Sequence, residues 1–294
     1  MSKNIAIIGT RGAGKSVFVT VLAKHLSTSK KGVTLIPDSY EVDEYIDLNY
    51  ATLQRGQWIP STNVEQTLSW QLEAPGKAKQ PVELMDIPGE DLQRLFARRE
   101  YEKDDLLESD MGLVDNLLGS STVLVLINLQ DFLDDSYDES KIRSKKLKEH
   151  ALKEFLTALR KDSKRKVAIV FTAYNQFRRL IEDDYDGIVE FLKKKTPAFF
   201  NAHIKGSGLP AFRVSAVRET QRSKHGSFPK PGFSHEGLDR VIDWLIDPDQ
   251  YLSKLNQRKS KAKEKTGDAT RETEPTSEKK TGETNADGPE WTDW

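Results

Sequence analysis

The residues best suited to chemistry lie near the start of the chain, in Gly9-Thr10-Arg11-Gly12-Ala13-Gly14-Lys15-Ser16. This run fits the pattern G-x-x-x-x-G-K-[ST], and it lies between an apolar run and a helical pattern from Lys15 through Leu26. Its glycines allow backbone N–H groups to surround phosphates, where Lys15 adds positive charge and the Ser16 hydroxyl can bind magnesium. A helix starting at Lys15 also directs the positive end of its dipole at the same anion. The run predicts a nucleoside-triphosphate site.

A second group of candidate residues lies in Leu84-Met85-Asp86-Ile87-Pro88-Gly89-Glu90. Asp86, at the end of an apolar run, suits a magnesium site reached through a bound water, and Gly89 can present its N–H to a γ-phosphate. Glu90 has two interpretations. It could orient or deprotonate an attacking water, although its charge beside the γ-phosphate requires a compensating cation. It could instead cap the next helix, because acidic residues favour a first helical turn.

No arginine can be assigned from sequence as the residue that stabilises the transition state. Arg11 could reach the phosphates from within its own loop, or it could be an exposed loop residue. Arg94, Arg98 and Arg99 recur after Gly89 and are predicted to form a solvated helix face. We therefore expect slow intrinsic hydrolysis that a partner or self-association accelerates.

The elements that must position these residues are short apolar runs alternating with helical patterns. Brief β-branched runs predict buried strands at 5–8, 82–85, 123–127 and 167–171, with a weaker one at 211–214. Helical stripes fall on Leu147, Leu152, Phe155, Leu156 and Leu159, and on Leu238, Val241, Ile242, Leu245 and Ile246. This alternation predicts an α/β fold of three layers, with a mostly parallel sheet covered on both faces.

One pair of strands departs from the parallel pattern. Alternation from Val64 to Leu72 is followed by the turn-rich segment 74–77, and the next strand begins at Val82. A link so short, with no helix in it, predicts an antiparallel hairpin.

With these motifs in place, residues 3 to 250 resemble the Ras-like, translation-factor-related class of P-loop GTPases. Asp86 and Gly89 match the third signature of that class. The class places a threonine before its second strand, closing over magnesium and the γ-phosphate, and Thr62 stands there with Ser61 as the rival. The resemblance thus implies Mg²⁺ held by Ser16, Thr62 and Asp86. Together with the residues proposed above, the candidates for the chemistry are Lys15, Thr62, Glu90 and Arg11. The run Trp58-Ile59-Pro60-Ser61-Thr62, with Asp-Ile-Pro-Gly-Glu, is similar to bacterial double-GTPase relatives from predicted conflict or antiviral gene clusters.

The same resemblance locates the base-recognition signatures, [NT]-K-x-D and S-A-x. The chain has Thr172-Ala173-Tyr174-Asn175 after one strand and Ser215-Ala216-Val217 after the next. The second signature fits, whereas the first has Ala173 for lysine and Asn175 for aspartate. A carboxylate can accept two hydrogen bonds from guanine, but an amide offers one acceptor oxygen and an NH₂ donor. GTP is favoured, with ATP and XTP left open.

Composition restricts the remaining function classes. The chain has 45 basic and 46 acidic residues, a net charge of -1, which gives no global reason to expect nucleic acid or anionic membrane. The absence of cysteine excludes disulfides, thiolate zinc sites and a cysteine nucleophile. The five histidines show no metal-ligand spacing. Without an apolar signal region or a run of about 18 apolar residues, we expect a cytoplasmic protein.

Two regions are predicted, a P-loop domain over 1–257 and a charged tail over 258–294. Long polar stretches near 30–60 and 129–145 are predicted to be irregular surface insertions in the domain. The tail lacks leucine, isoleucine, valine, phenylalanine and tyrosine, so we expect it to be disordered. Trp291 and Trp294 could make its end a docking peptide, or the terminus could fold back onto the domain.

These patterns favour a magnesium-dependent GTPase-type switch that signals to a protein partner through segments 40–62 and 86–100, or through the tail. Two alternatives stay open. One is an ATP-dependent enzyme, either an ATPase or a small-molecule kinase. The other is a scaffold that holds nucleotide without hydrolysing it.

Overall fold

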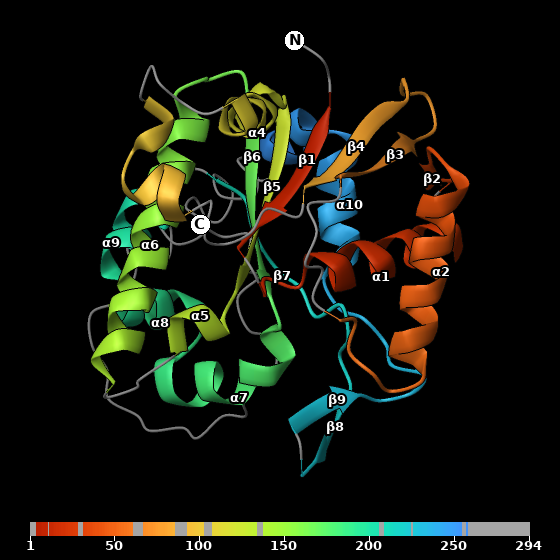
Figure 1. Cartoon of the computed structure of the whole chain (residues 1–294). Helices are drawn as coiled ribbons and strands as arrows, with labels where there is room; N and C mark the ends of the chain where they lie inside the picture. The colour runs from red at the N-terminus through yellow and green to blue at the C-terminus, as the bar shows by residue number, and fades with distance from the viewer. Residues whose placement is uncertain are drawn as a thin grey trace, which may run out of the picture.

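Seven strands form the central sheet of the computed structural model, in the order β2-β3-β4-β1-β5-β6-β7 (Figure 1). The structure describes residues 4–10, 12–28, 32–60, 67–85, 93–102, 108–133, 138–205, 209–224, 226–254 and 257. The expected tail, with Trp291 and Trp294, therefore lies outside the described residues.

The parallel part of the sheet contains the strands predicted from β-branched runs. They are β1 (Ile5–Gly9), β4 (Gln80–Met85), β5 (Thr122–Asn128), β6 (Lys166–Thr172) and β7 (Ala211–Arg213). β1 lies parallel to β4 on one side and to β5 on the other, and β5, β6 and β7 continue in parallel. Every residue of β1 is buried, as expected for a strand covered on both faces. The predicted α/β sheet is confirmed.

The antiparallel part of the sheet lies at its other edge. β3 (Thr67–Glu73) pairs antiparallel with β4 in a register that sets Trp70 opposite Val82, which confirms the expected hairpin over 67–85. An additional strand, β2 (Thr34–Pro37), pairs antiparallel with β3 and forms the edge of the sheet.

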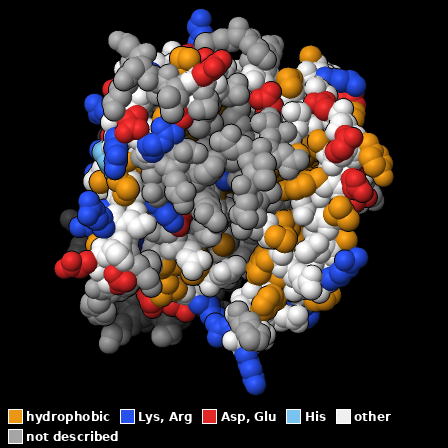
Figure 2. Space-filling view, viewed as in Figure 1, with side chains coloured by type: hydrophobic (Ala, Val, Ile, Leu, Met, Phe, Trp, Pro, Cys, Tyr) orange, Lys and Arg blue, Asp and Glu red, His pale blue; other side chains and the backbone are white. Residues whose placement is uncertain are grey.

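The expectation of irregular chain over 30–60 is wrong, because β2 and helix α2 (Tyr40–Gln54) occupy much of it. The hydroxyl of Ser39 accepts a hydrogen bond from the backbone N–H of Val42 at the start of α2, with acidic residues in the first turn. The buried stripe of this polar helix is narrow and consists of Val42, Ile46 and Leu53. The side of the molecule formed by β2 and α2 shows hydrophobic side chains at its surface (Figure 2).

The stretch 129–145 is also more regular than expected. It contains α5 (Gln130–Leu133) and the beginning of α6 (Glu139–Arg160), while residues 134–137 lie outside the described residues. The carboxylate of Asp138 accepts a hydrogen bond from the backbone N–H of Ser140 at 2.9 Å, which caps the first turn of α6. The sequence stripe on this helix identified its buried side correctly, except that Leu147 is 40% exposed.

Helices cover both faces of the sheet, and two hydrophobic clusters fill the layers between (Figure 1). One cluster includes residues of α1 (Lys15–Thr28), α2 and α10 (Leu238–Ile246). The other includes residues of α4 (Glu108–Gly119), α6, α7 (Tyr174–Tyr185), α8 (Ile188–Lys195), α9 (Pro197–Phe199) and two π-helical segments, η1 (Gln93–Ala97) and η3 (Phe200–Ile204). The three-layer architecture is thereby confirmed. Among the described residues, no helix is both long and apolar enough to cross a membrane.

A second, two-stranded sheet was not predicted. β8 (Thr220–Ser223) and β9 (Gly226–Pro229) form an antiparallel hairpin at the lower end of the molecule in Figure 1. It follows directly after the Ser215-Ala216-Val217 signature.

The three arginines predicted to form a solvated face differ from one another. Arg94 donates two hydrogen bonds, of 2.8 and 2.7 Å, to the carboxylate of Asp110 and holds the pKa of that carboxyl below its usual value. Arg99 lies between η1 and the short 3-10 helix η2 (Glu100–Glu102), and it pairs with Glu154 on α6. Arg98 and Arg99, whose side chains are 73% and 62% exposed, fit the expectation, whereas Arg94, at 38%, fits it less well.

Candidate nucleotide-binding site

The loop between β1 and α1 has the backbone that its glycines predict. Gly12 and Gly14 both have positive φ, of 79° and 78°, which residues other than glycine rarely adopt. At Gly9 the constraint is space, because a Cβ would lie 2.6 Å from the main-chain oxygen of Leu126 on β5. The glycines are therefore required by backbone conformation at two positions and by close packing against β5 at the third.

Lys15 is buried at the centre of this loop. Its ammonium donates hydrogen bonds to the main-chain oxygens of Gly9 at 2.8 Å and Thr10 at 3.3 Å. Ser16 and Val17 follow in the first turn of α1 and are half-buried. The N-terminal N–H groups of α1 and a buried ammonium thus converge on one place, which is an arrangement suited to binding phosphate.

The ends of two neighbouring strands hold the loop in position. The Thr172 hydroxyl, at the end of β6, donates a hydrogen bond of 2.8 Å to the main-chain oxygen of Ala13. The amide nitrogen of Asn128, at the end of β5, donates one of 3.0 Å to the oxygen of Gly12. The first residue of the predicted base signature is therefore joined directly to the phosphate loop.

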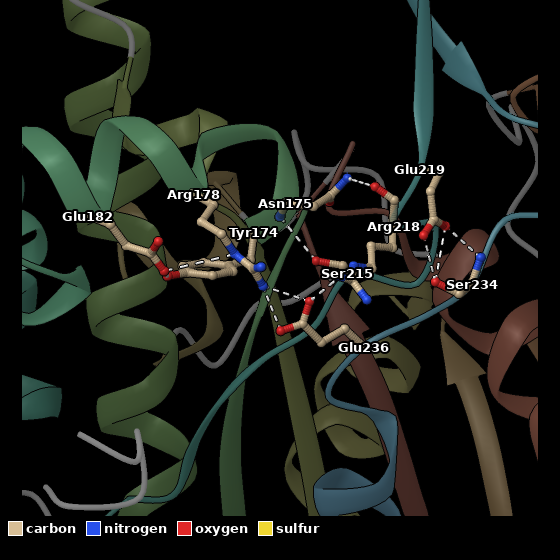
Figure 3. Close-up of polar contacts among 9 residues, drawn as sticks. All are labelled: Tyr174, Asn175, Arg178, Glu182, Ser215, Arg218, Glu219, Ser234 and Glu236. Atoms are coloured by element: carbon tan, nitrogen blue, oxygen red, sulfur yellow. Dashed lines mark hydrogen bonds and ion pairs between the residues drawn. The ribbon is translucent and has the colours of Figure 1, made fainter. Parts of the chain in front are cut away.

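The two base-recognition signatures meet at the start of α7. Ala173 has a positive φ of 58°, which turns the chain from β6 into this helix. The backbone N–H of Asn175 then donates to the Ser215 hydroxyl at 3.0 Å, and its side-chain NH₂ donates to the main-chain oxygen of Arg218 at 2.7 Å (Figure 3). The side-chain oxygen Oδ1 remains as the acceptor of this amide.

Further polar contacts support this junction (Figure 3). Ser215 and Glu236 exchange main-chain hydrogen bonds of 3.0 and 2.9 Å, and the Arg178 guanidinium donates to the Glu236 carboxylate at 2.6 Å. The Tyr174 hydroxyl donates to Glu182 at 2.9 Å, and burial raises the pKa of this tyrosine. The loop that carries the second signature is therefore held in place from two sides.

A cavity of about 390 Å³ lies between the phosphate loop and the two signatures, within the size range of small-ligand sites. The residues that line it come from the loop and α1, from the ends of β5, β6 and β7 with the starts of α5 and α7, from the second signature, and from two segments elsewhere in the chain. They are Gly12, Gly14, Val17, Phe18, Trp58, Asn128, Gln130, Thr172, Ala173, Asn175, Gln176, Val214, Ala216, Val217 and Ser227.

The structure thus brings together the described residues of the phosphate loop and both base signatures. Five predicted residues, Arg11, Thr62, Asp86, Gly89 and Glu90, lie outside the described residues. Within the part of the chain that is described, no group of three or more carboxylate or histidine side chains could hold a metal.

The lining residues that sequence reasoning did not assign to the site include Trp58, Asn128, Gln130 and Ser227. A signal existed for Asn128, a polar residue at the carboxyl end of a buried strand, where α/β proteins place ligands. For Ser227 the sequence offered no such signal.

A phosphate loop between the first strand and first helix of a mostly parallel sheet, joined to a cavity at the strand ends, defines a GTPase-like P-loop nucleotide-binding protein. The family model described as Double-GTPase 1 matches residues 6–207. The chain belongs to this Double-GTPase 1 family.

Two solved structures show a distant likeness. The Ski7 GTPase-like domain of S. cerevisiae, bound to GTP, is 12% identical, with a TM-score of 0.39, and the match covers 85% of this chain and 50% of that one. This chain therefore spans half the length of the Ski7 chain. The signal recognition particle receptor SRb-GTP/SRX complex from Chaetomium thermophilum is 12% identical, with a TM-score of 0.35, over 74% of this chain and 93% of that chain. No curated protein matches.

Proposed function

We propose that this protein binds GTP with Mg²⁺ and works as a slowly hydrolysing molecular switch that signals to a protein partner. The observation that carries the proposal is the bond between Thr172 and Ala13, because it joins the phosphate loop to the base signatures in one site. The buried Lys15 and the cavity beside it support the same conclusion. Membership of the Double-GTPase 1 family supports GTP as the nucleotide.

The residues available for magnesium fit that ion. Ser16 lies in the first turn of α1, next to the buried Lys15. We assign Thr62 and Asp86 as the other contributors, the latter through water. Hydroxyl and carboxylate oxygens are the hard ligands that Mg²⁺ prefers. When bound, the ion would neutralise charge on the β- and γ-phosphate oxygens.

The orientation of Asn175 supports guanine. Since its NH₂ donates to Arg218, its Oδ1 can accept a hydrogen bond from the N1–H or N2–H₂ edge of guanine. One acceptor replaces the two of a carboxylate, so we expect a modest preference for GTP over ATP and XTP. Substituting Asn175→Asp should strengthen that preference.

Hydrolysis should be slow in a dilute monomer, below about 1 per second. Lys15 would stabilise charge on the phosphates, while Arg11 and Glu90 are our candidates for the transition-state cation and the residue that orients water. The cation that completes the site would come from Arg11 or from a partner.

The test is binding and turnover of GTP, XTP and ATP with magnesium, for the wild-type protein, Lys15→Ala and Asn175→Asp. Selective GTP binding that Lys15→Ala abolishes would support the proposal. Preferred binding of ATP, with turnover above about 1 per second, would support an ATP-dependent enzyme instead. Tight GTP binding without turnover, even when a partner is present, would support the scaffold. If the wild-type protein binds none of the three, the proposal is wrong.

A further inference from the structure

Trp58 lies where the segment after α2 reaches the nucleotide cavity. Its half-buried side chain lines the cavity together with Val17 and Val217. The indole N–H donates a hydrogen bond of 2.6 Å to the main-chain oxygen of Ser227 on β9. One residue therefore forms part of the cavity wall and also contacts the β8–β9 hairpin.

The contact with the hairpin extends along the chain on the N-terminal side of Trp58. The side-chain oxygen of Gln54 accepts a hydrogen bond of 3.0 Å from the N–H of Gly232. Gly56 has a φ of 77°, and a Cβ there would lie 3.1 Å from the main-chain oxygen of Pro229. Residues 54–58 are thus packed closely against the hairpin and the turn that follows it.

The other end of the hairpin joins the base signatures. β8 begins two residues after Arg218, whose main-chain oxygen accepts the Asn175 hydrogen bond. Between them, the Glu219 carboxylate accepts hydrogen bonds from the N–H of Ser234 at 2.6 Å and from its hydroxyl at 2.8 Å (Figure 3). The hairpin is therefore anchored to the base side of the cavity at its root and to Trp58 at β9.

The chemistry of this wall suits a nucleobase or its ribose. An indole offers a large, flat apolar surface, and contact between an aromatic ring and a base is favourable whichever base is present. The two other described tryptophans, Trp70 and Trp244, are fully buried in the core and do not line the cavity. A core role is therefore sufficient to explain those two, whereas Trp58 also faces the site.

We propose that Trp58 contacts the bound nucleoside and that the β8–β9 hairpin is the support that holds it there. This inference rests on the proposed function, since it assumes that a nucleotide occupies the cavity. On this inference, Trp58 contributes to the affinity for any nucleotide, and Asn175 determines which base is preferred. It also makes the hairpin, which carries the exposed basic residues Arg222 and Lys224, a surface whose order depends on occupancy. Lys and Arg side chains project at this end of the molecule (Figure 2).

The first test is equilibrium binding of the fluorescent analogues mant-GTP and mant-ATP, read both by calorimetry and by energy transfer from tryptophan. Trp58→Ala should weaken both nucleotides about tenfold, in line with the value of one base–aromatic contact. Their affinity ratio should stay unchanged. Trp58→Phe keeps a ring, so it should bind within about threefold of wild type, yet lose much of the energy transfer.

Trp244→Phe is the matched control, because it removes one tryptophan that does not line the cavity. The indole N–H of Trp244 has no hydrogen-bond partner among the described residues, so replacing the indole by a phenyl ring breaks no hydrogen bond there. We expect wild-type affinity and most of the energy transfer to remain. Melting temperatures of all variants would confirm that they are folded.

The second test is hydrogen exchange of the amides in β8 and β9, with and without GTP. Nucleotide should slow exchange there in the wild-type protein and in Trp244→Phe, but much less in Trp58→Phe, which lacks the donor to Ser227. If nucleotide protects the β8 and β9 amides equally in Trp58→Phe and wild type, the hairpin is not linked to the nucleotide through Trp58.

The outcomes separate this inference from the proposed function. If wild type binds GTP, Lys15→Ala does not and Trp58→Ala binds as wild type does, the inference about Trp58 is wrong and the proposed function stands. If wild type binds no nucleotide, both are wrong.

Discussion

The hydroxyl of Thr172 lies 2.8 Å from the main-chain oxygen of Ala13, although the two residues are 159 positions apart in the chain. This hydrogen bond is buried and joins the end of β6 to the phosphate loop. A second, 3.0 Å long, runs from Asn128 at the end of β5 to Gly12. Hydrogen bonds from β5 and β6 therefore hold the loop in a conformation that its glycines allow, and the loop is preorganised for binding phosphate.

We predict that Thr172→Val weakens both the fold and the site. Valine keeps the shape of threonine but removes the donor, which leaves the buried oxygen of Ala13 without this partner. The expected cost is about 1–3 kcal/mol in the free energy of unfolding, measured with urea. GTP affinity, measured by calorimetry, should fall by about tenfold, because 1.4 kcal/mol corresponds to that factor. Thr172→Ser, which retains the hydroxyl, is the control, and equal loss in both variants would contradict the assigned bond.

Asn128→Asp should weaken nucleotide binding by more than Asn128→Ala does. The aspartate cannot donate to Gly12, and it adds a negative charge beside a site for phosphates. The alanine variant adds no charge, but it loses that hydrogen bond and also the one of 3.0 Å that the Asn128 side-chain oxygen accepts from the backbone N–H of Gln130. Binding constants at low and high salt separate the two effects, since salt screens charge repulsion and leaves the lost hydrogen bond. Identical affinities for the two variants at low salt would rule out repulsion from position 128.

The strands of the sheet could be predicted where burial on both faces makes the sequence itself distinctive. Runs such as 123–127 are apolar and β-branched throughout, so local pattern and tertiary structure agree. β2 and β8 gave no such signal. β8 is polar throughout and mostly exposed, and β2 is a short edge strand of four residues that ends in proline and has no fully buried position. Helix α2 was missed for a related reason, since Val42, Ile46 and Leu53 are a sparse stripe in a polar segment.

The phosphate loop could be predicted because its chemistry is local, with every contributing residue in one run. The remaining walls of the site could not, because they come from segments that only the fold brings together. Trp58 reaches the cavity because residues 54–58 pack on the β8–β9 hairpin, and its partner Ser227 in that hairpin is 169 positions away in the chain. No local pattern encodes such a contact.

Gly237 marks a place where the fold allows no side chain, and Gly237→Ala should be strongly destabilising. A Cβ there would lie 2.0 Å from the main-chain oxygen of Arg213, and its φ of 85° is unfavourable for alanine. The backbone at the end of β7 would have to move, so we expect a loss of about 3 kcal/mol or more, combining strain and displaced packing. Gly232→Ala is the matched control.

Gly232 has a similar φ of 73°, but nothing lies within 4 Å of a Cβ built there. Its substitution should therefore cost only the conformational strain, about 1–2 kcal/mol. Urea unfolding of both variants measures the difference. A Gly237→Ala protein as stable as Gly232→Ala would show that the contact with Arg213 is not as close as described.

His203 should make the stability of the protein depend on pH between about 4 and 6.5. The imidazole is 2% exposed and lies 3.0 Å from the main-chain oxygen of Lys153, and burial lowers its pKa from 6.5 to about 4. In this interval the unfolded chain binds a proton that the folded protein excludes. Stability is therefore complete above pH 6.5 and falls as the pH drops towards 4, by at most about 3 kcal/mol.

The measurement is the free energy of urea unfolding from pH 4 to 7 for wild type, His203→Gln and His150→Gln. His203→Gln should be less stable at pH 7, because glutamine fills the buried site poorly, but its stability should fall less steeply as the pH drops. Burial also lowers the pKa of His235, so part of the slope should remain in this variant. His150 is exposed on α6, and its substitution should leave the slope unchanged. A slope that is equally steep in His203→Gln and wild type would mean that His203 is not the buried neutral imidazole responsible for it.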